Sequence, residues 1–208
     1  EEEISADRSV KILDIGCGSG IIPLLLARKY PAAHFTWVEI QPELARIARR
    51  NTEANQMEDR ITILNRDARK LTVSELSGPA DLIVSNPPFK KKNSGRLNPS
   101  RQKAVAKHEI ELTLEDLLRQ SSALLSPGGT VCIIFPAERT TEILVLMEAY
   151  RIRPAMIRFV HPRRPDHAKL VIISGTRGGA GFPKIVSPMF IYNEQNEWTG
   201  EVKQMFSS

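Results

Sequence analysis

The stretch Val10-Lys11-Ile12-Leu13-Asp14-Ile15-Gly16-Cys17-Gly18-Ser19-Gly20 forms the first structural unit of the chain. Its apolar half, residues 10–15, is typical of a buried strand, and the glycines that follow are typical of a tight turn. The apolar run from Ile21 to Tyr30 suits a helix, which Pro31 ends. Glycines at a strand-to-helix turn let the backbone approach a ligand closely, and the helix N-terminus adds a positive dipole. The stretch therefore predicts a ligand-binding βα unit.

The alternation of strand and helix continues along the chain. We expect further strands at residues 35–40, 60–65, 81–85 and 130–135, and helices at 42–55, 112–125 and 138–150. Two later strands, 155–160 and 170–174, are separated by too few residues for a crossover helix, so they should pair antiparallel. A glycine-rich loop at 175–188 and a short edge element at 189–192 follow. The predicted fold class is α/β: a Rossmann-like doubly wound sheet, mostly parallel, with an antiparallel C-terminal hairpin.

The composition is that of an ordinary soluble domain. With 208 residues, of which 41% are hydrophobic and 25% charged, the chain is expected to form a single domain over residues 1–208. No apolar run approaches the ~20 residues of a membrane span, and the start Glu1-Glu2-Glu3-Ile4 is unlike a signal peptide. Cys17 and Cys132 match no metal-ligand spacing. We therefore expect a cytoplasmic protein with neither a membrane segment nor a metal site.

Positive charge is concentrated in two loops. Lys and Arg total 29 against 24 Asp and Glu, which gives a net charge of +5. The first basic group contains no acid and comprises Lys90, Lys91, Lys92, Arg96, Arg101, Lys103 and Lys107. The second comprises His161, Arg163, Arg164, His167 and Lys169. Two basic loops indicate a polyanionic partner, and histidines without carboxylate or cysteine partners indicate RNA contacts or surface positions rather than a metal site.

Three acids stand at the ends of the first three expected strands. Asp14 lies two residues ahead of the glycines, Glu39 at the end of the second strand, and Asp67 just after the third. Because the carboxyl ends of parallel strands share one edge of a sheet, these acids should lie close together. Glu39 suits the two hydroxyls of a ribose, and Asp67 suits an adenine amino group. The set indicates a ligand with a ribose, an adenine and an ammonium group but no pyrophosphate, which describes S-adenosyl-L-methionine better than NAD.

The expected strand at 81–85 ends in the turn Asn86-Pro87-Pro88-Phe89. Prolines do not continue a strand ladder, and Pro87 pushes Asn86 into an extended conformation, so the turn should be stiff. The Asn86 carboxamide oxygen and the Pro87 carbonyl are two acceptors for the hydrogens of a planar NH₂ group. Phe89 offers a face for base stacking, which is worth roughly 1–3 kcal/mol. The turn predicts recognition of an amino group, although by itself it is also compatible with simply ending a strand.

Together, the glycine loop, Glu39, Asp67 and the Asn-Pro-Pro-Phe turn resemble the class I S-adenosylmethionine-dependent methyltransferases that act on exocyclic or amide nitrogens. Other segments resemble the tRNA (adenine-N6)-methyltransferase family that modifies valine tRNA beside its anticodon. These segments are residues 20–27, Val38-Glu39-Ile40-Gln41, His108-Glu109, Val160-His161-Pro162, Gly178-Gly179 and Phe190-Ile191-Tyr192. The resemblance covers nearly the whole chain.

The resemblance implies roles for the matched residues. The cofactor-binding residues are Asp14, Gly16, Cys17, Gly18, Gly20, Glu39, Ile40, Asp67, Ala68 and Asn86, with the glycines at the methionine part, Glu39 at the ribose and Asp67 at the adenine. The catalytic residues are Asn86, Pro87, Pro88 and Phe89. For RNA binding we expect Lys90, Lys91, Lys92, Arg96, Arg101, His161, Arg163, Arg164 and Lys169. Family members carry a lead-in helix before the first strand, and since only residues 1–9 precede it here, we expect that helix to be missing.

The predicted function is S-adenosyl-L-methionine-dependent methylation of an exocyclic amino group in RNA, with adenine N6 of a tRNA near its anticodon as the target. Phe89 stands where adenine-modifying tRNA enzymes often have Tyr, and a related group of rRNA guanine-N2 methyltransferases uses Phe, so guanine stays an alternative. A protein glutamine-N5 methyltransferase would use the same two acceptors but would not need two basic loops. A catalytically silent RNA-binding module and an NAD oxidoreductase are the alternatives from other classes.

Overall fold

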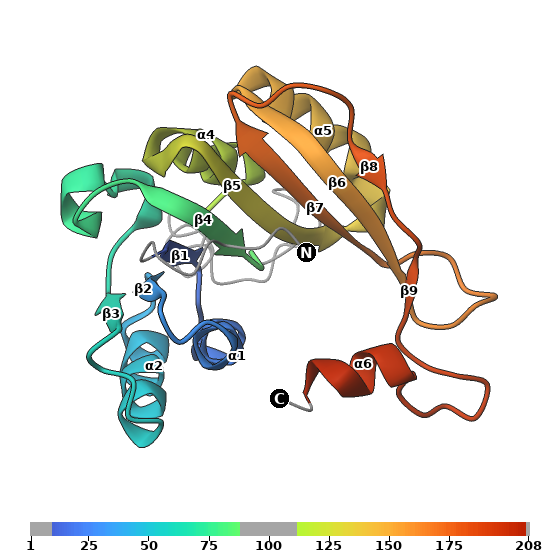
Figure 1. Cartoon of the computed structure of the whole chain (residues 1–208), viewed down its shortest axis with the longest axis horizontal. Coiled ribbons are helices and arrows are strands. Elements are labelled where there is room, and N and C mark those ends of the chain that lie inside the picture. The colour runs from blue at the N-terminus through green and yellow to red at the C-terminus, as the bar shows by residue number, and fades with distance from the viewer. Residues whose placement is uncertain (1–9, 88–111, 207–208) are drawn as a thin grey trace, which may run out of the picture.

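The computed structural model describes residues 10–87 and 112–206. Within them, nine strands form one sheet in the order β3-β2-β1-β4-β5-β7-β6-β8, and β9 also pairs with β6 (Figure 1). The strands are β1 Lys11–Ile15, β2 His34–Val38, β3 Ile61–Leu64, β4 Ala80–Ser85, β5 Leu125–Pro136, β6 Ile152–His161, β7 Leu170–Arg177, β8 Lys184–Ile185 and β9 Met189–Phe190. Strands β1 to β5 pair in parallel, and β7 is antiparallel to both β5 and β6. The predicted doubly wound sheet with an antiparallel hairpin is confirmed.

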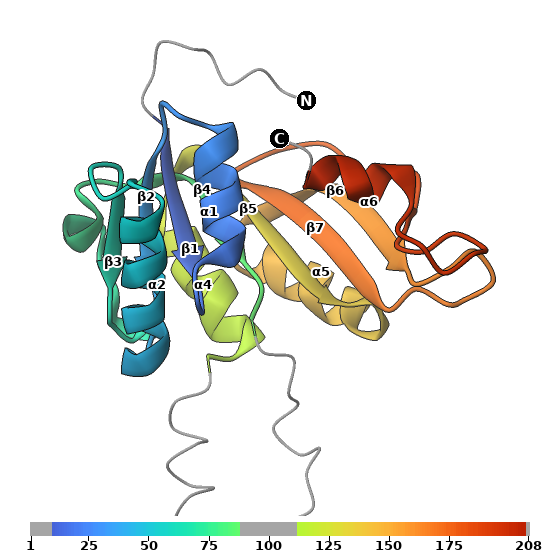
Figure 2. The same cartoon turned by 90° about the horizontal axis from the view of Figure 1, so that it is seen from below.

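Helices cover both faces of this sheet. They are α1 Ile21–Lys29, α2 Pro42–Ala54, α4 Leu114–Leu124, α5 Thr140–Ala149 and α6 Gly200–Met205, with 3₁₀ segments at Ala68–Lys70, Val73–Leu76 and Ala137–Arg139. Helices α1 and α2 lie on one face, and α4 and α5 lie on the other (Figure 2). Neighbouring strand residues point to opposite faces, so Ile12 packs in the core beneath α1 and α2 while Leu13 packs in the core beneath α4 and α5. None of the helices in the described ranges has both the length and the apolar character needed to cross a membrane.

The strand order places β1 at the point where the chain changes direction across the sheet. Strands β2 and β3 lie on one side of β1, and β4 and β5 lie on the other. In open α/β sheets, ligands bind beside the carboxyl ends of the strands at such a switch point. The register brings those ends level, because Ile15 pairs with Val38 and Asp14 pairs with Val84. The glycine loop and the Asn86 turn therefore leave the sheet side by side.

The start of β5 differs from the expectation. The helix expected at 112–125 ends at Leu124, and β5, expected at 130–135, begins at once at Leu125. Leu125 pairs with Ala80, and the register then shifts before Leu82 pairs with Thr130. Pro127, Gly128 and Gly129, which would also suit the end of a helix, thus belong to an irregular strand start.

The C-terminal part contains more structure than its sequence indicated. The expected glycine-rich loop at 175–188 includes the end of β7 and the whole of β8. Helix α6 was not expected; it is capped by Thr199, whose side chain accepts a hydrogen bond from the Val202 backbone N at 3.4 Å. Elements of two to six residues are too short for a hydrophobic period to show, which is why these were missed.

The glycine loop has a backbone that favours glycine at every second position. Gly16, Gly18 and Gly20 have φ angles of 80°, 58° and 84°. A Cβ on Gly20 would lie 2.5 Å from Cζ3 of Trp37, whereas a Cβ on Gly16 or Gly18 would meet no atom within 4 Å. Trp37 is fully buried, so it has little room to move away. Gly20 is therefore required by packing, and Gly16 and Gly18 present an open backbone.

We expect Gly20→Ala to destabilise the protein more than Gly18→Ala. Both substitutions place a side chain in the left-handed region, at a cost of about 1–2 kcal/mol. Only Gly20→Ala also overpacks the core against Trp37, which adds roughly 1–3 kcal/mol. Urea unfolding of the two variants measures the difference, and equal losses of unfolding free energy would contradict the packing role of Gly20.

Candidate functional site

Four strand ends carry the residues that the sequence singles out. The glycine loop follows β1, Glu39 follows β2, Asp67 comes shortly after β3, and Asn86 follows β4. The register places these ends at the same edge, because Ile15 pairs with Val38 and Val38 pairs with Leu64. The expectation that they meet at one edge of the sheet is met.

Glu39 holds the glycine loop in place. Its Oε2 accepts a hydrogen bond from the Gly18 backbone N at 3.0 Å, and its Oε1 accepts one from the Gln41 backbone N at 2.8 Å. The side chain is 5% exposed. Each carboxylate oxygen has a second lone pair, so the residue keeps acceptor capacity for the hydroxyls of a ribose. Glu39 thus has a structural role that its position in the sequence did not reveal.

Two asparagines fix the surroundings of Glu39. The Asn65 side-chain N donates to the backbone oxygens of Glu39 at 2.8 Å and Ile40 at 3.1 Å, which ties the end of β2 to the end of β3. The Asn51 side-chain N donates to the backbone oxygen of Ser19 at 2.8 Å, which ties α2 to the glycine loop. Sequence reasoning did not select either residue. The sequence did contain a signal for each: Asn65 is the last residue of the expected third strand, and Asn51 lies in the helix expected after the second strand.

Asp14 is a buried acid beside a second one. It lies in β1, is 3% exposed, and has a pKa raised from 3.8 to about 8, mainly because burial disfavours the charged form and further because of the negative charge of Glu39. A cation next to this buried acid would stabilise its ionised form. An ammonium group on a bound ligand would supply that cation.

Cys17 and Ala68 line the same edge without reactive chemistry. Burial, followed by the charges of Asp14 and Glu39, raises the pKa of the Cys17 thiol far above its ordinary value, so the nucleophilic thiolate is strongly disfavoured. Ala68 is buried, and its backbone oxygen accepts a 2.6 Å hydrogen bond from Nε2 of Gln120 in α4. Gln120 is 6% exposed. A polar residue on the inner face of a helix was the sequence signal for this contact, and it was missed.

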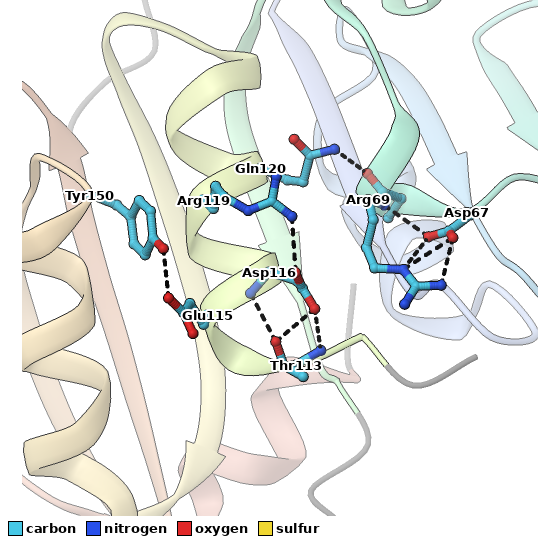
Figure 3. A network of polar contacts seen from close by, with 9 residues as sticks. Asp67, Arg69, Thr113, Glu115, Asp116, Arg119, Gln120 and Tyr150 are labelled. Atoms are coloured by element: carbon cyan, nitrogen blue, oxygen red, sulfur yellow. Dashed lines mark hydrogen bonds and ion pairs between the residues drawn. The ribbon is translucent and has the colours of Figure 1, made fainter. Parts of the chain in front are cut away.

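Asp67 is paired with Arg69 (Figure 3). Nη2 of Arg69 donates to Oδ2 of Asp67 at 2.7 Å, and Nε lies 3.0 Å from Oδ1 and 3.1 Å from Oδ2. The Arg69 backbone N also donates to Oδ1 at 3.0 Å. The Arg69 hydrogen bonds are the main reason why the pKa of Asp67 lies below its ordinary value. Any ligand amino group at Asp67 therefore shares this carboxylate with a guanidinium that the sequence reasoning did not select.

The start of α4 is fixed close to this pair. Thr113 and Asp116 form a reciprocal cap: the Thr113 hydroxyl donates to Oδ2 of Asp116 at 2.7 Å, and the Asp116 backbone N donates back at 3.0 Å. Arg119 holds the other oxygen of Asp116 at 2.9 Å (Figure 3). Such caps stabilise a helix by about 1 kcal/mol. The cap and the Gln120 contact together position α4 against the loop that carries Asp67.

The Asn86 turn is joined to the glycine loop by a side-chain contact. Ser85, the last residue of β4, donates from its hydroxyl to the backbone oxygen of Ile15 at 2.7 Å, and both residues are buried. Asn86, the next residue, is exposed, and Pro87 is buried. Pro88 and Phe89 lie outside the described residues, as do Lys90, Lys91, Lys92, Arg96 and Arg101.

The second basic group lies in the β6–β7 loop. Arg163, Arg164 and Lys169 are exposed, and His161 is half-buried, with its Nδ1 donating to the backbone oxygen of Asp166 at 2.8 Å. Because β7 is antiparallel to β5, Leu170 at the start of β7 pairs with Pro136 at the carboxyl end of β5. The loop therefore reaches the same edge of the sheet as Asn86. In the described part of the chain, His, Cys, Asp and Glu form no group of three or more that suits a metal ion.

The pKa of Asp14 predicts how stability depends on pH. The pKa of Asp14 is higher in the folded state than in the unfolded state. The contribution of Asp14 to the free energy of unfolding is therefore full below about pH 4 and is lost as the pH rises towards about 8. Each unit of pKa difference corresponds to about 1.4 kcal/mol. Asp14→Asn keeps the shape and removes the ionisation, so its melting temperature should fall less between pH 5 and pH 9. Asp59→Asn, a change at an exposed position, is the control and should keep the wild-type slope; equal slopes in all three proteins would contradict the assignment.

Comparison with known proteins identifies the family. A model described as "Methyltransferase small domain" matches residues 2–151. A tRNA1(Val) (adenine(37)-N6)-methyltransferase of Porphyromonas gingivalis is 42% identical over 142 residues, which cover 67% of this chain and 55% of the relative. One of the same name from Aeromonas hydrophila is 34% identical over 169 residues, which cover 81% of this chain and 69% of the relative. The chain thus spans just over half the length of the first of these relatives.

Solved structures agree in fold. A protein described as a predicted O-methyltransferase from Agrobacterium tumefaciens superposes with a TM-score of 0.77 at 22% identity, over 98% of this chain and 91% of that one. A ribosomal protein L11 methylase from Lactobacillus delbrueckii superposes with a TM-score of 0.59 at 18% identity, over 84% and 73%. The sequence matches confirm the resemblance drawn from the motifs. The chain belongs to the methyltransferase small domain family.

Proposed function

We propose that the chain methylates an exocyclic amino group of an RNA base, namely adenine N6 in a tRNA beside the anticodon. The observation that carries the proposal is the position of Asn86. Asn86 directly follows Ser85. The Ser85 hydroxyl donates a hydrogen bond to the backbone oxygen of Ile15, the last residue of β1, and the glycine loop begins at the next residue. A target amino group at Asn86 would therefore meet a cofactor at the glycine loop. The relatives named tRNA1(Val) (adenine(37)-N6)-methyltransferase support tRNA as the substrate, and a tRNA substrate implies a cytoplasmic protein.

The residues at the edge of the sheet fit S-adenosyl-L-methionine. Asp14 is a buried acid suited to an ammonium group, and Glu39 has acceptor capacity for a diol. Nothing lies within 4 Å of the Cβ positions of Gly16 and Gly18, so this backbone is accessible to a ligand. The bound cofactor supplies a methyl group on a positively charged sulfur, which is an electrophile at neutral pH.

Asn86 and Pro87 would prepare the nucleophile. Their two oxygens accept the two hydrogens of the target NH₂ group, which raises electron density on the nitrogen and favours a pyramidal nitrogen whose lone pair is less delocalised into the ring. Pro87, which carries the second acceptor, is buried. No strong base is needed, because the proton leaves after the N–C bond has formed. Most of the acceleration then comes from positioning and from the electrostatics around the reacting atoms.

A basic loop favours RNA over the protein alternative. Arg163, Arg164 and Lys169 lie at the same edge of the sheet as Asn86. A glutamine side-chain amide would fit the two acceptors equally well, but a peptide substrate gives no reason for this charge. An unpaired base in a tRNA loop reaches the acceptors at a lower cost than a base in a duplex.

Methyl transfer from labelled S-adenosyl-L-methionine to unmodified tRNA, followed by nucleoside analysis, tests the function. We expect N6-methyladenosine, and a loss of about a thousandfold in Asn86→Ala, equivalent to about 4 kcal/mol of barrier. The affinity for the cofactor should stay within twofold in that variant. Asn65→Ala is the contrasting variant: it loosens the end of β2 beside Glu39, so it should weaken cofactor binding more than it lowers the rate at saturation.

The outcomes separate the alternatives. N2-methylguanosine would keep the mechanism and change the base. Equal losses of rate and of cofactor affinity in Asn86→Ala would contradict its role at the target amino group. No labelled RNA, with cofactor binding intact, would overturn the RNA substrate.

The exposed lysine of the β6–β7 loop predicts a salt effect. If Lys169 contacts a phosphate, Lys169→Ala should weaken binding to all RNA sequences alike and reduce the slope of log affinity against log salt by about 0.7. Lys29→Ala is the matched control, because this exposed lysine ends α1 at the opposite edge of the sheet. Titration of a fluorescent tRNA at several salt concentrations measures both slopes. An unchanged slope in Lys169→Ala would exclude a phosphate contact by this residue.

A further inference from the structure

Backbone contacts bring the β6–β7 loop and the segment after β9 together. His161 pairs with Phe190, and the Tyr192 backbone N donates to the backbone oxygen of Pro162 at 2.9 Å. Nε of Arg163 donates to Oδ1 of Asn196 at 2.9 Å. The two loops lie side by side in both views (Figures 1 and 2). Two segments about thirty residues apart therefore form one surface.

Aromatic rings and arginines alternate on this surface. The Arg163 guanidinium carbon lies 5.8 Å from the centre of the Tyr192 ring, and that of Arg164 lies 5.6 Å from the centre of Phe190. Trp198, bridged to Tyr192 through the backbone, stacks on Phe206 with ring centres 5.3 Å apart and planes at 22°. The exposed fractions are 37% for Tyr192, 47% for Trp198 and 56% for Phe206. Large rings that stay this exposed in a folded chain mark a binding surface.

Three acids of the same region have basic partners. Glu201 pairs with Arg158 at 2.5 Å, Glu197 lies 3.7 Å from Lys203, and Asp166 lies 3.6 Å from Nη1 of Arg163. Glu194 is exposed. Arg164 pairs with no carboxylate among the described residues, and its guanidinium lies over an aromatic ring instead. The surface thus offers a positive charge beside flat apolar faces. This combination suits unpaired nucleotides, whose phosphates pair with arginine and whose bases stack on rings.

The surface lies at the edge of the sheet that carries Asn86. From β4, the next strands are β5, β7 and β6, and β6 ends at His161. Ile157 is level with Ser85 through the pairs Ser85–Ile133, Ile133–Ile173 and Ile173–Ile157, so β6 runs four residues past the end of β4. Three strand spacings of about 4.8 Å and a rise of about 3.3 Å per residue place the end of β6 roughly 20 Å from the end of β4. A few nucleotides of unpaired RNA span such a distance. A base held at Asn86 and a neighbouring segment of the same RNA loop can therefore be bound together.

We propose that Tyr192 and Trp198, with Arg163 and Arg164 beside them, bind an unpaired nucleotide a few positions away from the methylated base in the same RNA loop. This inference rests on the proposed RNA methyltransferase function and adds to it a second contact with the substrate. Tyr192 and Trp198 are positioning residues: they bind the RNA loop and do not touch the reacting nitrogen. Their loss should raise the KM for RNA and leave kcat and the affinity for the cofactor unchanged.

The opposite end of the hairpin supplies a matched control. Phe182 is 92% exposed, and the Arg153 guanidinium carbon lies 5.9 Å from its ring centre, so the same kind of pair exists there. Arg153 pairs with Thr176 near the start of β6 and the end of β7, at the edge of the sheet away from Asn86. We expect Trp198→Ala to raise the KM for an unmodified tRNA transcript about tenfold, and Phe182→Ala to leave it unchanged. Equal KM values in the two variants, with wild-type activity present, would overturn the proposal.

Fluorescence gives a readout independent of methylation. The chain has two tryptophans, of which Trp37 is fully buried and Trp198 is half-exposed. The tRNA transcript should quench wild-type fluorescence, a fully paired RNA duplex should quench it much less, and Trp198→Phe should abolish the quenching while keeping the KM near that of wild type. Quenching that persists in Trp198→Phe would overturn the assignment. A wild-type protein that is quenched by tRNA but methylates no RNA would contradict the proposed function and leave this contact supported.

Discussion

Two carboxylates, Asp14 and Glu39, are buried at the edge of the sheet where the glycine loop begins, and the geometry of the site depends on how they are accommodated. Glu39 bonds to the backbone N atoms of Gly18 and Gln41, so its charge is used to hold the loop. Asp14 is left with a pKa of about 8, because burial and the nearby Glu39 oppose its ionisation. Charge buried in this way is costly unless a cation or hydrogen-bond donors meet it. A ligand carrying an ammonium group and a diol would relieve that cost.

The general plan was readable from the sequence. Short apolar strands alternating with helices, and a final pair of strands too close for a crossover, predicted the sheet and its antiparallel hairpin. The rule that parallel strands end at one edge then brought Asp14, Glu39, Asp67 and Asn86 together. These deductions succeed because they depend on local periodicity and on the direction of strands, both of which the sequence records. The chemical roles of the four residues stay predictions.

Hydrogen bonds between residues far apart in the sequence could not be predicted from the sequence. Ser85 and Ile15 are 70 positions apart, and Gln120 and Ala68 are 52 apart, so no periodic pattern connects them. Arg69 is only two positions from Asp67, but the sequence is equally compatible with an Arg69 side chain that points to solvent. The backbone conformation of the folded chain directs this side chain to Asp67. The irregular start of β5 was missed for a related reason: a proline and two glycines are equally suited to a helix stop and to a distorted strand.

The direction of β7 has a consequence for how the molecule divides its tasks. Because β7 runs against β5, a turn between two strands, rather than a helix, arrives beside the carboxyl ends of the parallel strands. The residues that we predict to bind the cofactor come from the first half of the chain, and this turn comes from the last quarter. Length and composition are therefore free to vary in the turn without disturbing the predicted cofactor site. A protein with this fold can therefore change its substrate while it keeps its reaction. Sequence differences between related enzymes with different substrates would be concentrated in the β6–β7 hairpin.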